Sequence, residues 1–259
     1  MAARFDYNMI VARSSATSPQ KRRSAAKRAS AGATTAVSAV EKAYAAIKQE
    51  ILSNTLRPGD AIPVEQFVRE LRLSRTPVRE ATLRLEREGL IDIRPRLGTF
   101  VSHLDLRKIR DMYAVRRLLE GQAAREAALR GPLGDFQELR AELAAYPETG
   151  QIDSRGMSET GKRVHQLIVA HCGNEVLGNM ILSLQDHFTR FRSLSIQIPE
   201  KVLSSHHEHL EILDGLIARD AGRASELIHQ HFDHASRFLL DSLLSGSSAT
   251  SPRVTIAFV

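Results

Sequence analysis

Three histidines in the C-terminal half of the chain are of the residue type that could share one metal ion. His165, His209 and His231 each fall on the apolar stripe of a different periodic segment, which predicts that three helices point one imidazole each into the interior. One such histidine is usually a hydrogen-bonded packing residue. Three converging imidazoles are costly to desolvate without a common partner, and a divalent transition metal such as zinc or nickel is the natural one. We therefore predict a three-histidine metal site.

A buried charge is expected in the same interior. Arg116 lies on a stripe with Ile109 and Tyr113, so its guanidinium should point inward, and Glu120 follows one helical turn later. A buried guanidinium suits a carboxylate ligand, whereas a purely structural pair between Arg116 and Glu120 is an equally good interpretation. We predict Arg116 and Glu120 as effector-binding residues.

A second chemistry is suggested nearer the N-terminus, by the segment LSRTPVREATLRLEREG at Leu73–Gly89. Ser74 is suited to cap a helix and Pro77 to occupy its first turn. Arg75 and Arg79 then lie one turn apart near the helix start, where guanidinium groups can bind guanine O6 and N7 in the major groove of DNA. On these residues alone, a surface helix with solvated charges is about as good an interpretation. The predicted inward face is formed by Val78, Ala81 and Leu85.

The flanking sequence favours the DNA-binding interpretation. Apolar periodicity predicts a first helix over residues 37–53 and a second from Pro63 to Leu71, separated by a turn and a short strand in LRPGDAI. The third helix should stop at Gly89, and two short strands follow around a hairpin tip that contains Arg96. Three helices and a basic hairpin make a winged helix-turn-helix, in which Arg94 and Arg96 can reach phosphates or the minor groove.

This region resembles the N-terminal domain of the GntR family of bacterial transcription regulators. The elements LRPG, SRTPVREA, LRLEREGL and RPRLGTFV occur in the family's order and spacing, and with the first helix the resemblance covers residues 37–103. Two positions depart from the pattern. Glu65 replaces an arginine that contacts DNA in some members, and Thr82-Leu83 reverses the family's usual order of an apolar residue followed by a polar one. Both should alter only operator preference. The resemblance implies DNA contacts from Ser74, Arg75, Thr76 and Arg79, with Arg96 and Gly98 in the wing.

From Leu104 onward every periodic segment is helical. The breaks between segments are GPLG, YPETG, HCGN, IPE and RDAG, and an all-α antiparallel bundle with an interior ligand pocket should result. The predicted helices span residues 105–130, 135–145, 154–172, 175–196, 200–218 and 221–244. The fold class is therefore mainly α: a basic tail (1–36), a winged helix-turn-helix (37–103), the bundle (104–244) and a C-terminal tail (245–259).

The bundle resembles the FCD ligand-binding domain of the FadR subfamily over about residues 104–242. The matching stretches are MYAVRRLLEGQAAREAALRG, VHQLIVAHCGNEVL and EHLEILDGLIARDAGRASELIHQHFDHA. The resemblance implies that effectors are small organic acids and that His165, His209 and His231 are metal ligands.

One position departs from the FCD pattern. Gly161 stands where the family carries an aspartate ligand, and Glu159 should lie on another face of the helix. We expect any metal to be bound more weakly than in relatives that carry the aspartate, with water or effector in the vacant positions. Gly161→Asp should then raise the metal affinity. Without metal, the histidines would bind an anionic effector directly or simply pack in the core. The remaining histidines are expected to lie near their own stripe (His187) or in solvent (His171, His206, His207, His229 and His234).

Composition sets the class of protein. The chain has 259 residues, of which 42% are hydrophobic, enough for two cores. A single cysteine, Cys172, fits a reducing compartment, and neither a membrane-spanning run nor the apolar core of a signal peptide is evident. We expect a cytoplasmic protein that does not bind membranes. Residues 1–36 carry seven Lys/Arg residues and one acidic residue, so this tail either adds phosphate contacts to DNA or is an inert extension.

Together these features predict a ligand-responsive transcription regulator that binds a palindromic DNA operator as a homodimer and responds to a small carboxylate metabolite. A metal-dependent hydrolase built on the three histidines is the alternative from another class. It needs a general base, and the inward stripes offer no free carboxylate, since Gly161 removes the best candidate. A constitutive DNA-architectural protein would leave the buried polar pocket without a role.

Overall fold

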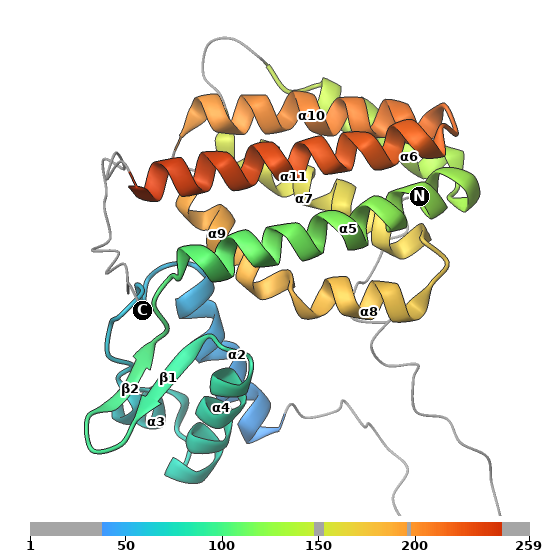
Figure 1. Ribbon diagram of the computed structural model, residues 1–259. Helices are drawn as coiled ribbons and strands as arrows, with labels where there is room; N and C mark the ends of the chain where they lie inside the picture. The colour runs from blue at the N-terminus through green and yellow to red at the C-terminus, as the bar shows by residue number, and fades with distance from the viewer. Residues whose placement is uncertain (1–37, 148–152, 196–197, 245–259) are drawn as a thin grey trace, which may run out of the picture. The chain divides into compact units, whose positions relative to one another are not determined.

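The computed structural model describes residues 38–147, 153–195 and 198–244 (Figure 1). The interpretations of the two tails, 1–36 and 245–259, therefore fall outside the described residues. Within them, every regular element is a helix except for one two-stranded hairpin. The predicted fold class is confirmed: a winged helix-turn-helix precedes an all-helical bundle.

The N-terminal domain packs three helices and a hairpin around one core. Helix α2 lies against α4, and their contact buries Ile47, Ile51 and Leu85 completely. The strands are antiparallel, with Ile91 opposite Val101. Burial of this apolar face supplies most of the stability of such short helices. The elements are α2 (Ala39–Leu52), α3 (Val64–Leu71), α4 (Arg75–Arg87), β1 (Ile91–Arg94) and β2 (Gly98–Val101).

Left-handed residues set the turns that orient α4. Arg72, which ends α3, has a φ of 54°, and Gly89 after α4 has a φ of 71°, as predicted for a helix stop. Ser74 occupies the N-cap position of α4 in an extended conformation, but its side chain makes no capping hydrogen bond. At the hairpin tip, Arg96 has a φ of 66° and Gly98 a φ of 125°. The second value lies in a region that side chains rarely adopt, so glycine is needed there.

The C-terminal domain is a bundle in which α5 lies along α11, and α10 packs against α11, α6 and α7 (Figure 1). Its core includes Phe136, Ile168, Ile212 and Ile228, all with 0% exposure. The helices are α5 (Leu106–Arg130), α6 (Leu133–Ala144), α7 (Ser154–His171), α8 (Glu175–Ser183), α9 (Gln185–Ser195), α10 (Pro199–Ile217) and α11 (Ala221–Leu244). No helix of the described ranges is long and apolar enough to cross a membrane.

One predicted helix is in fact two. The segment 175–196 was expected to be continuous, but it divides at Leu184 into α8 and α9. Leu184 keeps a near-helical backbone (φ −92°, ψ −10°), and neither glycine nor proline marks the break. Apolar periodicity continues across it, so the sequence carried no sign of the change in direction. As a result, α9 has its own orientation and its own set of partners.

Candidate metal, effector and DNA-binding sites

The three predicted histidines meet inside the bundle. His165 comes from α7, His209 from α10 and His231 from α11, and each offers one nitrogen within 4.8 Å of the others. The Nε2 atoms of His165 and His209 lie 3.3 Å apart. This separation is close to what two ligands of one ion would show. The cluster therefore has the donor set of a transition-metal site.

Two carboxylates orient two of the imidazoles. The Nδ1 of His165 donates to Glu120 Oε2 at 2.5 Å, and the Nδ1 of His231 donates to Glu208 Oε2 at 2.6 Å. Each bond leaves the Nε2 lone pair of that ring available. Metal-bound histidines are commonly held in this way, with a carboxylate on the ring nitrogen that does not bind the ion.

His209 differs from the other two. Its Nδ1 is buried and has no hydrogen-bond partner among the described residues. Burial lowers the pKa of His209 well below its ordinary value, and His231 and His165 lower it further. Burial also lowers the pKa of His231, which Glu208 partly offsets. Neutral imidazoles are the form that binds metal, so the site fits a zinc- or nickel-like ion. We take the three-histidine cluster as a candidate site for such an ion.

Glu120 is the buried carboxylate beneath the site, with 0% exposure. Arg116 donates from Nε to Glu120 Oε1 at 2.5 Å, and its guanidinium also lies 4.3 Å from the ring centre of Phe188. Burial alone would raise the pKa of Glu120, but Arg116 and His165 more than offset this and lower it to about 2. The predicted ion pair is therefore present. Glu120 lies between Arg116 and His165, where it positions both.

A cavity of about 120 Å³ opens beside the histidines. Aromatic side chains of Tyr113, Phe188 and Phe232 form an apolar wall. Arg116 reaches this cavity, whereas Glu120 is not among its lining residues. Small ligand pockets commonly combine an apolar wall with a few polar groups in this way. The other positively charged lining residues are Lys162, Arg192 and Lys201.

Several lining residues escaped the sequence interpretation. His206 was expected in solvent, but it is 2% exposed and lines the cavity. It precedes His209 by three residues and so shares its side of α10, which is the signal that could have identified it. Of the other off-stripe histidines, His207 and His234 are exposed, while His171 and His229 are partly buried. Arg192 and Lys201 also went unnoticed, because charged residues are mostly found at the surface.

The space at Gly161 is already filled. A Cβ atom built on Gly161 would lie 2.6 Å from both Nδ1 and Cε1 of His209. Any side chain at residue 161 must therefore displace the His209 ring. This contact argues against the expectation that Gly161→Asp would simply add a fourth ligand. Glu159 is 60% exposed, in agreement with its placement on another face of α7.

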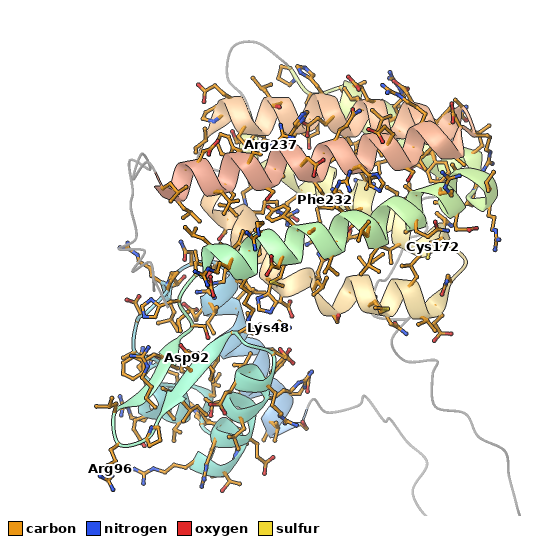
Figure 2. The ribbon with its side chains drawn as sticks, in the orientation of Figure 1. Lys48, Asp92, Arg96, Cys172, Phe232 and Arg237 are labelled. Carbon is orange, nitrogen blue, oxygen red and sulfur yellow. The ribbon has the colours of Figure 1, made fainter. Side chains whose placement is uncertain are left out.

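The residues predicted to contact DNA are exposed. Ser74, Arg75, Thr76 and Arg79 lie at the start of α4 and are accessible, as are Arg94, Arg96 and Gly98 of the hairpin. Figure 2 shows Arg96 at the hairpin tip. Arg75 pairs with Glu65, with Nε and Oε1 3.1 Å apart. The side chain of Arg79 makes no hydrogen bond or ion pair with any other described residue.

Comparison with known proteins identifies both domains. The family model for bacterial regulatory proteins of the gntR family matches residues 39–101, and the model for the FCD domain matches residues 111–234. The Nta operon transcriptional regulator of Aminobacter aminovorans is 31% identical over 186 residues, which cover 70% of this chain and 87% of that protein. This chain belongs to the GntR family of bacterial transcription regulators. Its C-terminal FCD domain assigns it to the FadR-like subfamily.

Other relatives of this GntR-family regulator agree. The transcriptional repressor RspR of Escherichia coli is 25% identical over 202 residues, 76% of this chain and 86% of that protein. The solved structure of E. coli McbR/YncC has 21% identity and a TM-score of 0.66, covering 80% of this chain and 100% of that one, which supports the fold. The matched family and the curated relatives are transcription regulators, not enzymes, and none of these comparisons supports the hydrolase alternative.

The first prediction concerns Glu120. Glu120→Gln should lower the free energy of unfolding by about 3–5 kcal/mol, because it leaves the buried Arg116 without its anion. Since folding lowers the pKa of Glu120 from 4.5 to about 2, its contribution is present above pH 4.5 and is lost as the pH falls toward 2. Urea denaturation at pH 7 and at pH 3 measures both effects. The control is Glu138→Gln on the exposed face of α6. Equal stability of the two variants at pH 7 would contradict the role of Glu120.

The second prediction concerns Gly161. Gly161→Ala should destabilise the protein by about 1–3 kcal/mol through overpacking against His209. It should also weaken binding of Zn²⁺ or Ni²⁺ by about 10-fold or more, because a ligand is displaced. Calorimetric titration and thermal unfolding test both effects. Gly134→Ala is a matched control, since a Cβ there meets nothing within 4 Å. Tighter metal binding by Gly161→Asp than by the wild type would restore the expectation drawn from the sequence.

Proposed function

We propose that this regulator binds a palindromic operator as a homodimer, and that a small organic acid in the FCD domain changes its affinity for that operator. The observation that carries this proposal is the position of α9. This helix lines the cavity with Phe188, Thr189 and Arg192. Its other residues contact the DNA-binding domain and the segment that leaves it.

Two contacts from α9 involve helices of the DNA-binding domain. Asp186 forms an ion pair with Lys48 of α2, which is labelled in Figure 2. His187 donates from Nε2 to the backbone carbonyl oxygen of Glu88 at 2.9 Å. Glu88 is the C-cap of α4, the helix with the DNA-contacting arginines. A shift of α9 would therefore move the far end of this recognition helix.

A third contact involves the residue that follows the hairpin. Arg190 is 3% exposed and donates to the backbone carbonyl oxygen of Ser102, directly after β2. The Ser102 hydroxyl in turn donates to Asp92 of β1 at 2.9 Å. Burial lowers the pKa of Arg190 to about 10, so the side chain stays charged at neutral pH. Removing this donor would leave a buried carbonyl without its partner, so the contact should be stiff.

The effector is assigned to the cavity beside the histidines. Arg116 presents a guanidinium there, which suits a carboxylate, and Glu120 fixes its position. If the histidines hold a metal ion, that ion supplies a Lewis-acidic anchor for the effector. His165, His209 and His231 would be its protein ligands, and no carboxylate of the described residues lies among them. Both arrangements favour an anionic ligand.

The homodimer is assigned to an exposed apolar face on α5 and α8. Val115, Leu118 and Leu129 on α5 are 47%, 62% and 59% exposed, and Val176 and Met180 on α8 are 71% and 51% exposed. The three α5 residues share one side of the helix, and α5 packs against α8. We propose that a second copy covers this face, because two half-sites related by two-fold symmetry need two symmetric recognition helices. By similarity to the repressors RspR and GlaR of E. coli, operator binding would repress transcription.

The third prediction tests the DNA contacts. Arg75→Ala and Arg79→Ala should each weaken operator binding by about 1–3 kcal/mol without affecting folding. Arg87→Ala, at the other end of α4, is the control and should bind normally. Glu65→Gln should strengthen binding, because it releases Arg75 and removes a negative charge near the phosphates. Fluorescence anisotropy on a labelled operator measures all four variants. Unchanged affinity in both arginine variants would refute the assignment.

The fourth prediction tests the dimer. Leu118→Asp and Met180→Asp should each shift the protein toward monomer and weaken operator binding, because a charge is placed in an apolar contact. Leu133→Asp is the control, since Leu133 is 39% exposed and belongs to α6 rather than to α5 or α8. Analytical ultracentrifugation gives the oligomeric state. A wild-type protein that sediments as a monomer at micromolar concentration would contradict the proposal.

The fifth prediction tests the coupling through α9. A thermal-shift screen of organic acids, with and without Zn²⁺ or Ni²⁺, identifies the ligand that raises the Tm most. This ligand should change the operator affinity of the wild type by about 5–150-fold. His187→Ala should reduce that factor while the ligand still binds normally, because one contact to α4 is lost. His207→Ala, exposed on α10, is the control. A factor equal to the wild-type value in His187→Ala would show that this contact carries no coupling.

A further inference from the structure

Two positive charges in the cavity lack a buried anionic partner at hydrogen-bond distance. Lys201 is 9% exposed, and its ammonium makes no hydrogen bond or ion pair of 4 Å or less with any residue of the described ranges. The ring centre of Phe238 lies 5.6 Å from the ammonium nitrogen. Arg116, by contrast, has Glu120 at 2.5 Å. Lys201 is therefore a buried cation that nothing in the described structure neutralises directly.

Arg192 has only a weak partner. Its one ion pair among the described residues is with Glu159, at 3.8 Å, and that carboxylate is 60% exposed. Glu159 is also shared with Lys162, which lies 3.7 Å from it. The single solvated carboxylate of Glu159 is therefore shared between two cations, Arg192 and Lys162. Arg192 keeps most of its charge available to whatever enters the cavity.

Burial lowers the pKa of both groups. Glu208 partly offsets the effect of burial on the pKa of Lys201. Glu159 partly offsets its effect on the pKa of Arg192, and the positive charge of Arg116 lowers that pKa further. An unpaired buried ammonium or guanidinium is unfavourable, and apolar residues of similar volume would be more stable. A bound anion would relieve this cost.

The two cations flank the histidine cluster from separate helices. Arg192 of α9 acts electrostatically on His209, and Lys201 of α10 acts on His231. The two carboxylates at the cluster are already engaged, Glu120 by Arg116 and His165, and Glu208 by His231 and His234. The cavity therefore has positive charge in excess of what one carboxylate bound to Arg116 would balance.

We propose that Arg192 and Lys201 form a second anion-binding subsite, and that the effector is a short dicarboxylate. One carboxylate would bind at Arg116 and the histidines, and the other between Arg192 and Lys201. Tyr113, Phe188 and Phe232 provide an apolar wall for the carbon chain, and a cavity of about 120 Å³ suits a short one. The inference rests on the proposed function, in which the FCD domain binds an organic acid.

The test compares acids that differ by one carboxylate. Full-length protein is titrated calorimetrically with propanoate and malonate, butanoate and succinate, and pentanoate and glutarate, at constant ionic strength. At least one dicarboxylate should bind 10-fold or more tightly than its monocarboxylate partner. Arg192→Gln and Lys201→Gln should each remove most of this preference, because each weakens binding of the dicarboxylate much more than binding of the monocarboxylate. Arg155→Gln, exposed on α7, is the control.

A second measurement separates binding from folding. Because Lys201 is unpaired in the free protein, Lys201→Met should leave the Tm of the ligand-free protein unchanged or raise it, while succinate or its best homologue no longer stabilises the variant preferentially. A purely structural lysine would give a lower Tm instead, which would overturn the proposal.

The remaining outcomes also decide the question. Monocarboxylates that bind as tightly as their dicarboxylate partners would overturn the second subsite and leave the proposed function standing. If Arg192→Gln and Lys201→Gln weaken the binding of monocarboxylates and dicarboxylates equally, the second subsite is likewise overturned, because equal losses of affinity indicate a general electrostatic effect. Inorganic phosphate that binds more tightly than every dicarboxylate would refute the assigned ligand class. Failure of every acid to bind would reject the organic-acid effector as well.

Discussion

The buried carboxylate of Glu120 is the constraint around which the effector domain is organised. One oxygen accepts from Arg116 and the other from His165, so a single residue of α5 fixes a cation and a histidine of α7. The carboxylate stays charged because these partners outweigh its desolvation. Without it, Arg116 would be an unpaired buried charge and His165 would lose the bond that orients its ring.

The two halves of the cavity differ in whether the protein's own carboxylates neutralise their positive charges. Around the histidines, Glu120 and Glu208 balance the positive groups that they touch, and the buried imidazoles of His209 and His231 stay neutral. Arg192 and Lys201 have no comparable partner. The protein therefore presents one half that is preorganised by its own carboxylates and another whose charge is left for a ligand. Preorganisation of this kind lowers the ordering cost of binding.

The sequence was most informative where function depends on local pattern. The order of motifs identified the winged helix-turn-helix, and the stripes identified the three inward-facing histidines, since both patterns depend on residues close in sequence. What it missed depends on contacts between distant residues. Nothing in the pattern around Glu208 indicates its bond to His231 on the next helix. Packing between distant residues likewise places His209 in the space beside Gly161 and sets the helix break at Leu184, and it overrides local preference.

The two faces of α9 have a consequence for how the regulator would respond in a cell. If the effector changes operator affinity through Asp186, His187 and Arg190, thermodynamic reciprocity requires the operator to change effector affinity by the same factor. Regulator molecules on their operator and those free in solution would then respond at different metabolite concentrations. The number of operator copies relative to regulator would thus help to set the threshold of induction, as a property of the population rather than of one molecule.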